Sequence, residues 1–120
     1  MNKPELVAHC MAKPGVQEDY PFGPDTQVFK VIGKVFALTD AGNDAETVNL
    51  KCDPEHAILL RQTYPKDVLP GYHMNKRHWN TVTLAGAVPD DLLLELIDES
   101  YDLVVASLKK SERDQLRGMP

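Results

Sequence analysis

The stretch TQVFKVIGKVFALTD, residues 26–40, decides the fold of this chain. Its two halves, residues 26–32 and 35–40, are rich in β-branched and aromatic residues, which favour strands. Gly33-Lys34 lies between them, and a glycine at the first central position is typical of a type II′ turn. The stretch therefore predicts a β-hairpin.

Two further strands follow this hairpin in the sequence. Residues 46–52, ETVNLKC, alternate between residues that we expect to point inward (Val48, Leu50, Cys52) and outward (Thr47, Asn49, Lys51). Residues 80–84, NTVTL, alternate in the same way. The pattern predicts a sheet with one face covered by other elements and the opposite face open to solvent.

Helical signals surround the strands. The predicted helices are a first segment ended by Lys13-Pro14-Gly15, a second from N-cap Asp53 to about Thr63, a long one from Pro89 to about Leu108, and a short one that starts with a capping box at Ser111 and ends at Gly118. Residues 16–25 contain two prolines and are predicted to be a loop, and residues 66–79 are predicted to be irregular.

The order of elements, α-β-β-β-α-loop-β-α-α, predicts one α+β domain over residues 1–120: a sandwich of an antiparallel sheet with helices on one face. A chain of 120 residues has room for one core, and 42% hydrophobic residues can fill it. The regular strand–helix alternation of a doubly wound nucleotide-binding fold is missing.

Charge and composition indicate which partners and which cellular compartment to expect. The chain has 13 basic and 18 acidic residues, a net charge of -5, which disfavours indiscriminate binding of polyanions but leaves room for a local basic patch. No apolar run is long enough for a membrane span, and the N-terminus lacks the apolar stretch of a signal peptide. We expect a cytoplasmic monomer without membrane contact, in which Cys10 and Cys52 are buried free thiols.

The segment PGYHMNKRHWNTV, residues 70–82, carries the candidate binding residues. They are Tyr72, His73, Asn75, Lys76, Arg77, His78 and Trp79. Cations hold phosphates, rings stack on bases, and an amide reads base edges, so the segment is typical of a recognition loop. In the structural interpretation, Trp79 packs against the sheet and the charges are only solvated.

Three sheet lysines extend this candidate surface. Lys51 is predicted on the open face, and Lys30 and Lys34 belong to the hairpin. With Lys76 and Arg77 they would form a positive surface on an acidic protein.

Other chemistry has weaker support. His73 and His78 are too few for zinc, and His9, His56, Cys10 and Cys52 show no ligand spacing with them. No serine lies in a nucleophile elbow, and no glycine-rich loop could cradle a phosphate. We therefore expect no metal, no cofactor and no catalytic residues.

The long predicted helix has an acidic stripe. Asp91, Glu95, Asp98 and Asp102 follow one another at spacings of three and four residues. A solvated outer face is the ordinary interpretation, and a surface for a basic partner is the alternative.

The chain resembles the MmcQ/YjbR family of small bacterial proteins nearly from end to end. The resemblance lies in the strings AKPG (12–15), EDYPFG (18–23), FKVIGKVFAL (29–38), NLKCDPE (49–55), LR (60–61), PGYHMNKRHWNTV (70–82) and SYDLVVASL (100–108). It implies a compact α/β sandwich known as a double-wing fold, similar to the DNA-binding domain of a phage transcription activator and distantly to frataxin. By that analogy it implies DNA binding.

The favoured function is thus a non-catalytic module that binds DNA or RNA, or regulates, through the open sheet face and the loop at 70–82. One alternative is a small-molecule-binding protein or enzyme that uses the His73–His78 loop. The other is a protein-interaction adaptor that uses the acidic stripe.

Overall fold

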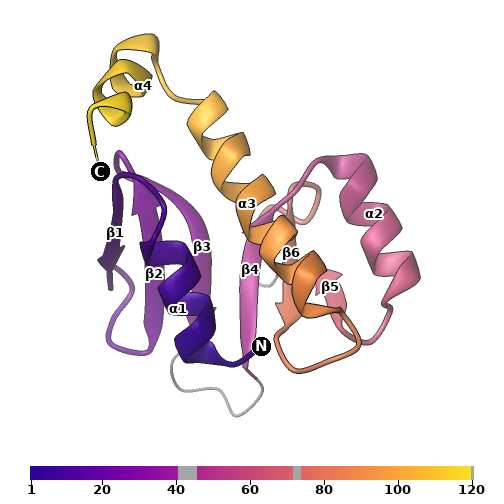
Figure 1. Ribbon diagram of the computed structural model, residues 1–120. Coiled ribbons are helices and arrows are strands. Elements are labelled where there is room, and N and C mark those ends of the chain that lie inside the picture. Colours follow the sequence, from indigo (N-terminus) through magenta and orange to yellow (C-terminus); the bar gives the residue numbers. More distant parts are fainter. Residues whose placement is uncertain (41–45, 72–73, 120) are drawn as a thin grey trace.

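The protein folds around a six-stranded antiparallel sheet with strand order β1-β2-β3-β4-β6-β5 (Figure 1). This computed structural model describes residues 1–40, 46–71 and 74–119, without the side chain of Asp40. The strands are β1 (Val16–Asp19), β2 (Thr26–Val31), β3 (Lys34–Asp40), β4 (Thr47–Lys51), β5 (Val68–Pro70) and β6 (Trp79–Thr83). The helices of the described residues are α1 (Lys3–Met11), α2 (Pro54–Thr63), α3 (Asp90–Ala106) and α4 (Lys110–Arg117).

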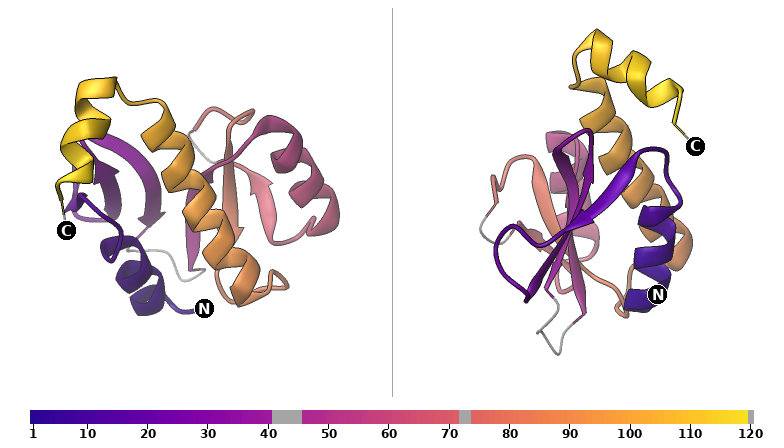
Figure 2. Two further views of the ribbon diagram at one scale, coloured as in Figure 1. Left: turned by 45° about the horizontal axis from the view of Figure 1, so that its top comes forward. Right: turned by 90° about the vertical axis from the view of Figure 1, so that its left-hand side faces the viewer.

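The helices cover one face of the sheet, as the sequence predicts. Helix α3 lies diagonally across β3 and β4, α1 lies beside β1, and α2 lies beside β5 (Figures 1 and 2). The core between the layers is built from buried side chains of both, among them Phe29, Val48, Leu50, Val82, Leu6, Ala57, Leu93 and Ile97. No helix of the described residues is long and apolar enough to cross a membrane.

The central hairpin forms, but its turn is one residue earlier than predicted. Val31 pairs with Lys34, so the two turn residues are Ile32 and Gly33. Both have positive φ, 47° and 77°, which is the condition for a type I′ turn rather than type II′. Positive φ is costly for a β-branched residue such as Ile32, so sequence preference points to the wrong register.

Two short strands at the sheet edges lie where the sequence predicts a loop (residues 16–25) and an irregular segment (residues 66–79). β1 pairs with β2 from Val16 to Asp19, and β5 pairs with β6 from Val68 to Pro70. Each is only a few residues long and adjoins prolines, so neither shows an alternating pattern. The first residue of the last helix was also misplaced: α4 starts at Lys110, after Lys109, whose backbone N–H donates to Glu112 Oε1 at 3.0 Å.

The face of the sheet away from the helices is only partly open. Lys30, Asn49, Lys51 and Thr81 are half-buried there. Val28 and Leu38, paired across β2 and β3, also point to this face, yet they are 0% and 8% exposed. Both strands carry apolar residues at successive positions and therefore bury side chains on both faces.

Candidate functional site

Arg61 of α2 holds the candidate loop in place. Its Nε donates to Asn80 Oδ1 at 2.7 Å, and its Nη2 donates to the backbone carbonyls of Lys76 and, at 3.3 Å, Trp79. Asn80 is 2% exposed and its Nδ2 donates to the Ala57 carbonyl at 3.4 Å. The guanidinium thus joins α2 to the loop and to the first residues of β6.

Within the loop, residues divide into those that shape the backbone and those that face solvent. Asn75 Oδ1 accepts the backbone N–H of Arg77 at 3.0 Å, so this amide forms a turn. The carbonyl of His78 accepts the N–H of Cys52 at 2.7 Å, which attaches the loop to the end of β4. Lys76 and Arg77 are exposed, as predicted. Tyr72 and His73 lie outside the described residues.

Trp79 and Lys51 form the last pair of the β4–β6 ladder, next to the loop. They lie opposite each other in the β4–β6 ladder, so their side chains point the same way. Because Leu50 and Val48 point into the core, the alternation places Lys51 and Trp79 on the solvent side. Trp79 is half-buried in this position. Leu69 of β5 lies on the same face and is 49% exposed.

The three sheet lysines do not form one cluster. Lys30 lies on the open face, but its Nζ pairs with Asp19 Oδ2 at 2.8 Å. Hydrogen bonds from Lys30 and from the Tyr20 N–H lower the pKa of the Asp19 carboxyl. Lys34 points to the helix side, where its Nζ donates to the Ser107 carbonyl at 3.3 Å, at the end of α3. Of the three, Lys51 lies beside the loop, and no carboxylate of the described residues pairs with it.

The acidic stripe of α3 is partly neutralised. Asp98 Oδ1 lies 2.5 Å from Lys13 Nζ and 2.8 Å from His9 Nε2. Partial burial by itself would raise the pKa of Asp98, but hydrogen bonds from Lys13 and His9 outweigh it and lower that pKa. Asp91, Glu95 and Asp102 are exposed. The stripe therefore also attaches α3 to α1.

We expect Asp98→Asn to destabilise the protein by less than about 1 kcal/mol at neutral pH, because this carboxylate is half-exposed and its ion pairs are screened. Its folded-state pKa is lowered, so the stabilisation is present above the unfolded pKa of about 3.9 and is lost as pH falls through the folded pKa. Urea unfolding near neutral pH and below about pH 4 checks this. The difference from the unmodified protein should shrink in acid. A pH-independent difference would contradict the assignment.

One cluster, between β4, α2 and α3, is absent from our predictions from the sequence. Cys52 Sγ lies 3.5 Å from His56 Nδ1 and 3.4 Å from Glu99 Oε1, and His56 Nδ1 lies 2.9 Å from Glu99 Oε2. The Asp53 N–H also donates to Glu99 Oε1, at 3.4 Å. The Cys-x-x-x-His spacing at 52–56 is a usable signal, whereas nothing in the sequence singles out Glu99.

Both thiols are buried and free, as predicted. Burial raises the pKa of Cys52 to about 12, and the nearby Glu99 carboxylate adds to the shift. Burial also raises the pKa of Cys10 to about 12. At neutral pH both groups are thiols rather than thiolates, so neither is an activated nucleophile.

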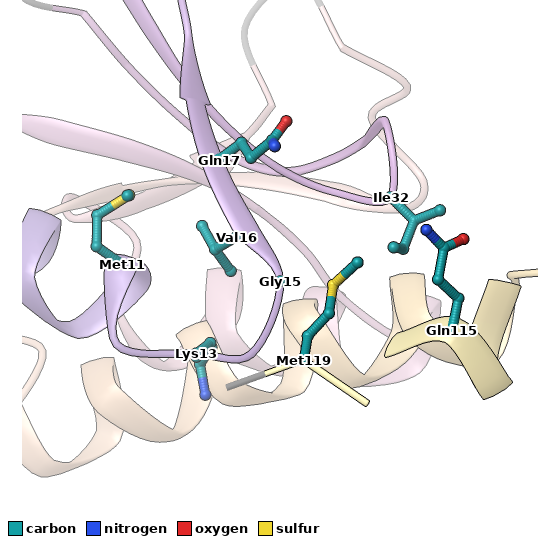
Figure 3. A pocket seen from close by; sticks show the side chains of 8 residues that line it. All are labelled: Met11, Lys13, Gly15, Val16, Gln17, Ile32, Gln115 and Met119. Atoms are coloured by element: carbon teal, nitrogen blue, oxygen red, sulfur yellow. The ribbon is translucent and has the colours of Figure 1, made fainter. Parts of the chain in front are cut away.

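A groove of about 460 Å³ lies where α1, β1, the central hairpin and α4 meet (Figure 3). The side chains of Met11, Val16, Ile32 and Met119 line it. Among the described residues that line it, Lys13 carries the charge, and its Nζ is held by Asp98. Gln17 and Gln115 also line the groove, so its surface mixes apolar and polar side chains, and we do not place the functional site there.

The fold and its loop define a small α+β sandwich domain, and comparison with known proteins gives its family. The YjbR family model matches residues 11–103, so the chain belongs to the YjbR family, as the resemblance implied. It is 44% identical over 107 residues to YbdF of Escherichia coli O157:H7, covering 89% of this chain and 85% of that protein. It is 39% identical over 112 residues to YjbR of Escherichia coli K12, covering 93% and 94%.

A crystal structure of a Deinococcus radiodurans protein has the same fold. It superposes with a TM-score of 0.90 at 44% identity, covering 98% of this chain and 88% of the other. A protein from Pseudomonas syringae superposes with a TM-score of 0.74 at 30% identity, covering 86% and 98%. None of these names states an activity, so a function has to be argued from the residues.

Proposed function

We propose that this protein is a non-catalytic module that binds single-stranded nucleic acid through β4, β6 and the loop residues 74–78. The observation that carries the proposal is the pairing of Trp79 with Lys51 on the open face, beside the exposed cations Lys76 and Arg77. Among the described side chains, no carboxylate pairs with these three cations. The proposal requires a cytoplasmic location, as the sequence predicts.

The combination of the half-buried Trp79 ring with nearby cations favours single strands over duplexes. An unpaired base can stack on Trp79 while Lys51, Lys76 and Arg77 hold the phosphates on either side. A duplex hides its base faces, and reading it requires a helix or ribbon that enters a groove. With three cations, the affinity should fall with salt with a logarithmic slope of about −2, since single strands give roughly −0.7 per phosphate contacted.

Rigid support of the loop adds to the argument. Arg61 fixes the backbone at Lys76 and Trp79, and Cys52 fixes it at His78. A cation presented on a fixed backbone loses less conformational freedom when it binds a phosphate, so even three contacts give measurable affinity. Loop residues 74–78 and 20–25 both project on the side of the sheet away from α1 and α3 (Figure 2).

The test is fluorescence anisotropy with a labelled oligothymidine and a duplex of the same length. We expect tighter binding of the single strand, weakened by about fivefold or more in Lys76→Ala/Arg77→Ala because two phosphate contacts are lost. Trp79→Ala should weaken binding by about 5- to 100-fold, the usual value of one stacked base. Both variants are checked for folding by circular dichroism.

Lys109→Ala/Lys110→Ala is the matched control, because it removes two exposed cations at the far end of α3. It should leave binding unchanged. Absence of binding to any oligonucleotide at low salt would reject the proposal, and so would equal losses in the control. Chemical-shift changes confined to the loop with a metabolite panel, together with no response to oligonucleotides, would favour the small-molecule alternative instead.

A further inference from the structure

We propose that Cys52, His56 and Glu99 form a binding site for Zn²⁺, with three protein ligands and a fourth position open to water. The site is independent of the proposed nucleic-acid surface, because Cys52 points to the helix side of the sheet. Thiolate, imidazole and carboxylate are the ligand types that zinc takes in proteins, and sites that keep an open position have three protein ligands. Among the described residues, this is the one group of such side chains close enough to share an ion.

The spacing of the three ligand atoms matches a tetrahedral zinc site. With ordinary Zn–S, Zn–N and Zn–O bonds, tetrahedral geometry separates sulfur from nitrogen or oxygen by about 3.5 Å and nitrogen from oxygen by about 3.3 Å. Here Sγ lies 3.5 Å from Nδ1 and 3.4 Å from Oε1, and Nδ1 lies 3.2 Å from Oε1. An ion could therefore enter with little movement of the three side chains.

The backbone holds each ligand on a separate, well-anchored element. Cys52 directly follows β4, His56 lies in the first turn of α2, and Glu99 lies in the middle of α3. Asp53 caps α2 and so fixes the distance between the cysteine and the histidine. Three ligands on three packed elements lose little freedom when an ion binds.

One of the three ligands is buried and the other two are partly exposed, as expected for a zinc site with one position open to water. Cys52 is only 4% exposed, while the side chains of His56 and Glu99 are 37% and 26% exposed. An ion can reach the site from the His56 and Glu99 side, and a water molecule can occupy its fourth position there. On binding, the Zn–S bond forms as the thiol proton of Cys52 leaves to solvent, with no change of oxidation state.

The experiment uses Co²⁺ as a spectroscopic substitute for Zn²⁺ on protein first treated with a chelator. We expect one equivalent to bind with thiolate-to-cobalt charge-transfer absorption, and Zn²⁺ to displace it. Cys52→Ala should abolish the absorption, and His56→Ala and the near-isosteric Glu99→Gln should weaken binding by more than about tenfold. At the same concentration, Zn²⁺ should also raise the melting temperature of the unmodified protein more than that of Glu99→Gln.

Cys10→Ala is the matched control, because Cys10 is also a buried free thiol but lies in α1, outside the cluster. It should bind Co²⁺ like the unmodified protein. Folded protein that shows no charge-transfer absorption would overturn the proposal. So would an absorption that survives Cys52→Ala or disappears in Cys10→Ala.

Discussion

Replacing Ser100 with alanine is expected to lower the free energy of unfolding by about 2–4 kcal/mol. Ser100 is 0% exposed, its Oγ accepts the Lys51 N–H at 2.8 Å, and its O–H donates to the Phe36 carbonyl at 2.5 Å. Alanine would leave both backbone groups buried without partners, at about 1–3 kcal/mol each. Urea unfolding monitored by circular dichroism measures the change.

The large effect follows from the position of Ser100 in the sheet. The β3–β4 ladder ends at the pair Ala37–Leu50, and the β2–β3 register shifts at Phe36. The serine hydroxyl therefore replaces a missing strand–strand bond. Ser107→Ala is the control, because its Oγ donates to Val104 O at the exposed end of α3 and its loss should cost less than about 1 kcal/mol. Equal effects of the two substitutions would contradict this account.

Replacing Arg61 with lysine should destabilise the protein by about 1.5–3 kcal/mol although the charge is kept. A lysine ammonium cannot replace the guanidinium fork that holds Asn80 and the carbonyls of Lys76 and Trp79 together. If the loop binds nucleic acid, this substitution should also weaken binding about 5- to 30-fold, because Lys76 and Arg77 lose their fixed positions. Unfolding and anisotropy measured on the same preparation give both numbers.

Arg113→Lys separates the two effects. Arg113 also holds backbone carbonyls, those of Ala106 at 3.4 Å and Leu108 at 2.6 Å, but at the other end of the molecule. It should lower stability without changing oligonucleotide affinity. If Arg61→Lys left the loop chemical shifts unchanged, the guanidinium would not be the support that the hydrogen bonds indicate.

Local sequence rules predict most of this fold because the long elements carry strong patterns. The Asp53-Pro54 start of α2, the start of α3 after Pro89 and the alternation of β4 are each confirmed. The predicted position of the central turn is wrong by one residue. Packing of Ile32 against the core outweighs the energetic cost of its positive φ. Edge strands of three or four residues are too short to show a period.

The candidate site was less predictable because it depends on pairs that are distant in the chain. The exposure of Lys76 and Arg77 could be predicted because both side chains are charged. The partners of Arg61 in the loop are 15 to 19 residues away in the sequence, and Glu99 is 43 residues from His56, so neither contact could be predicted. A polar residue at an inward strand position, Asn80, is the one local signal that a buried partner exists. Lys34 and Lys30 lie on opposite faces of the sheet because of the turn register, and the residue preferences of the turn predict that register wrongly.

The two edge strands have a consequence for how the protein behaves at high concentration. An exposed edge with free backbone N–H groups can recruit another chain and start aggregation. Here β1 is only four residues long and carries Glu18 and Asp19, and β5 is three residues long and ends in Pro70, which has no N–H to donate. Both edges of the sheet therefore disfavour the addition of a strand from another copy of the protein.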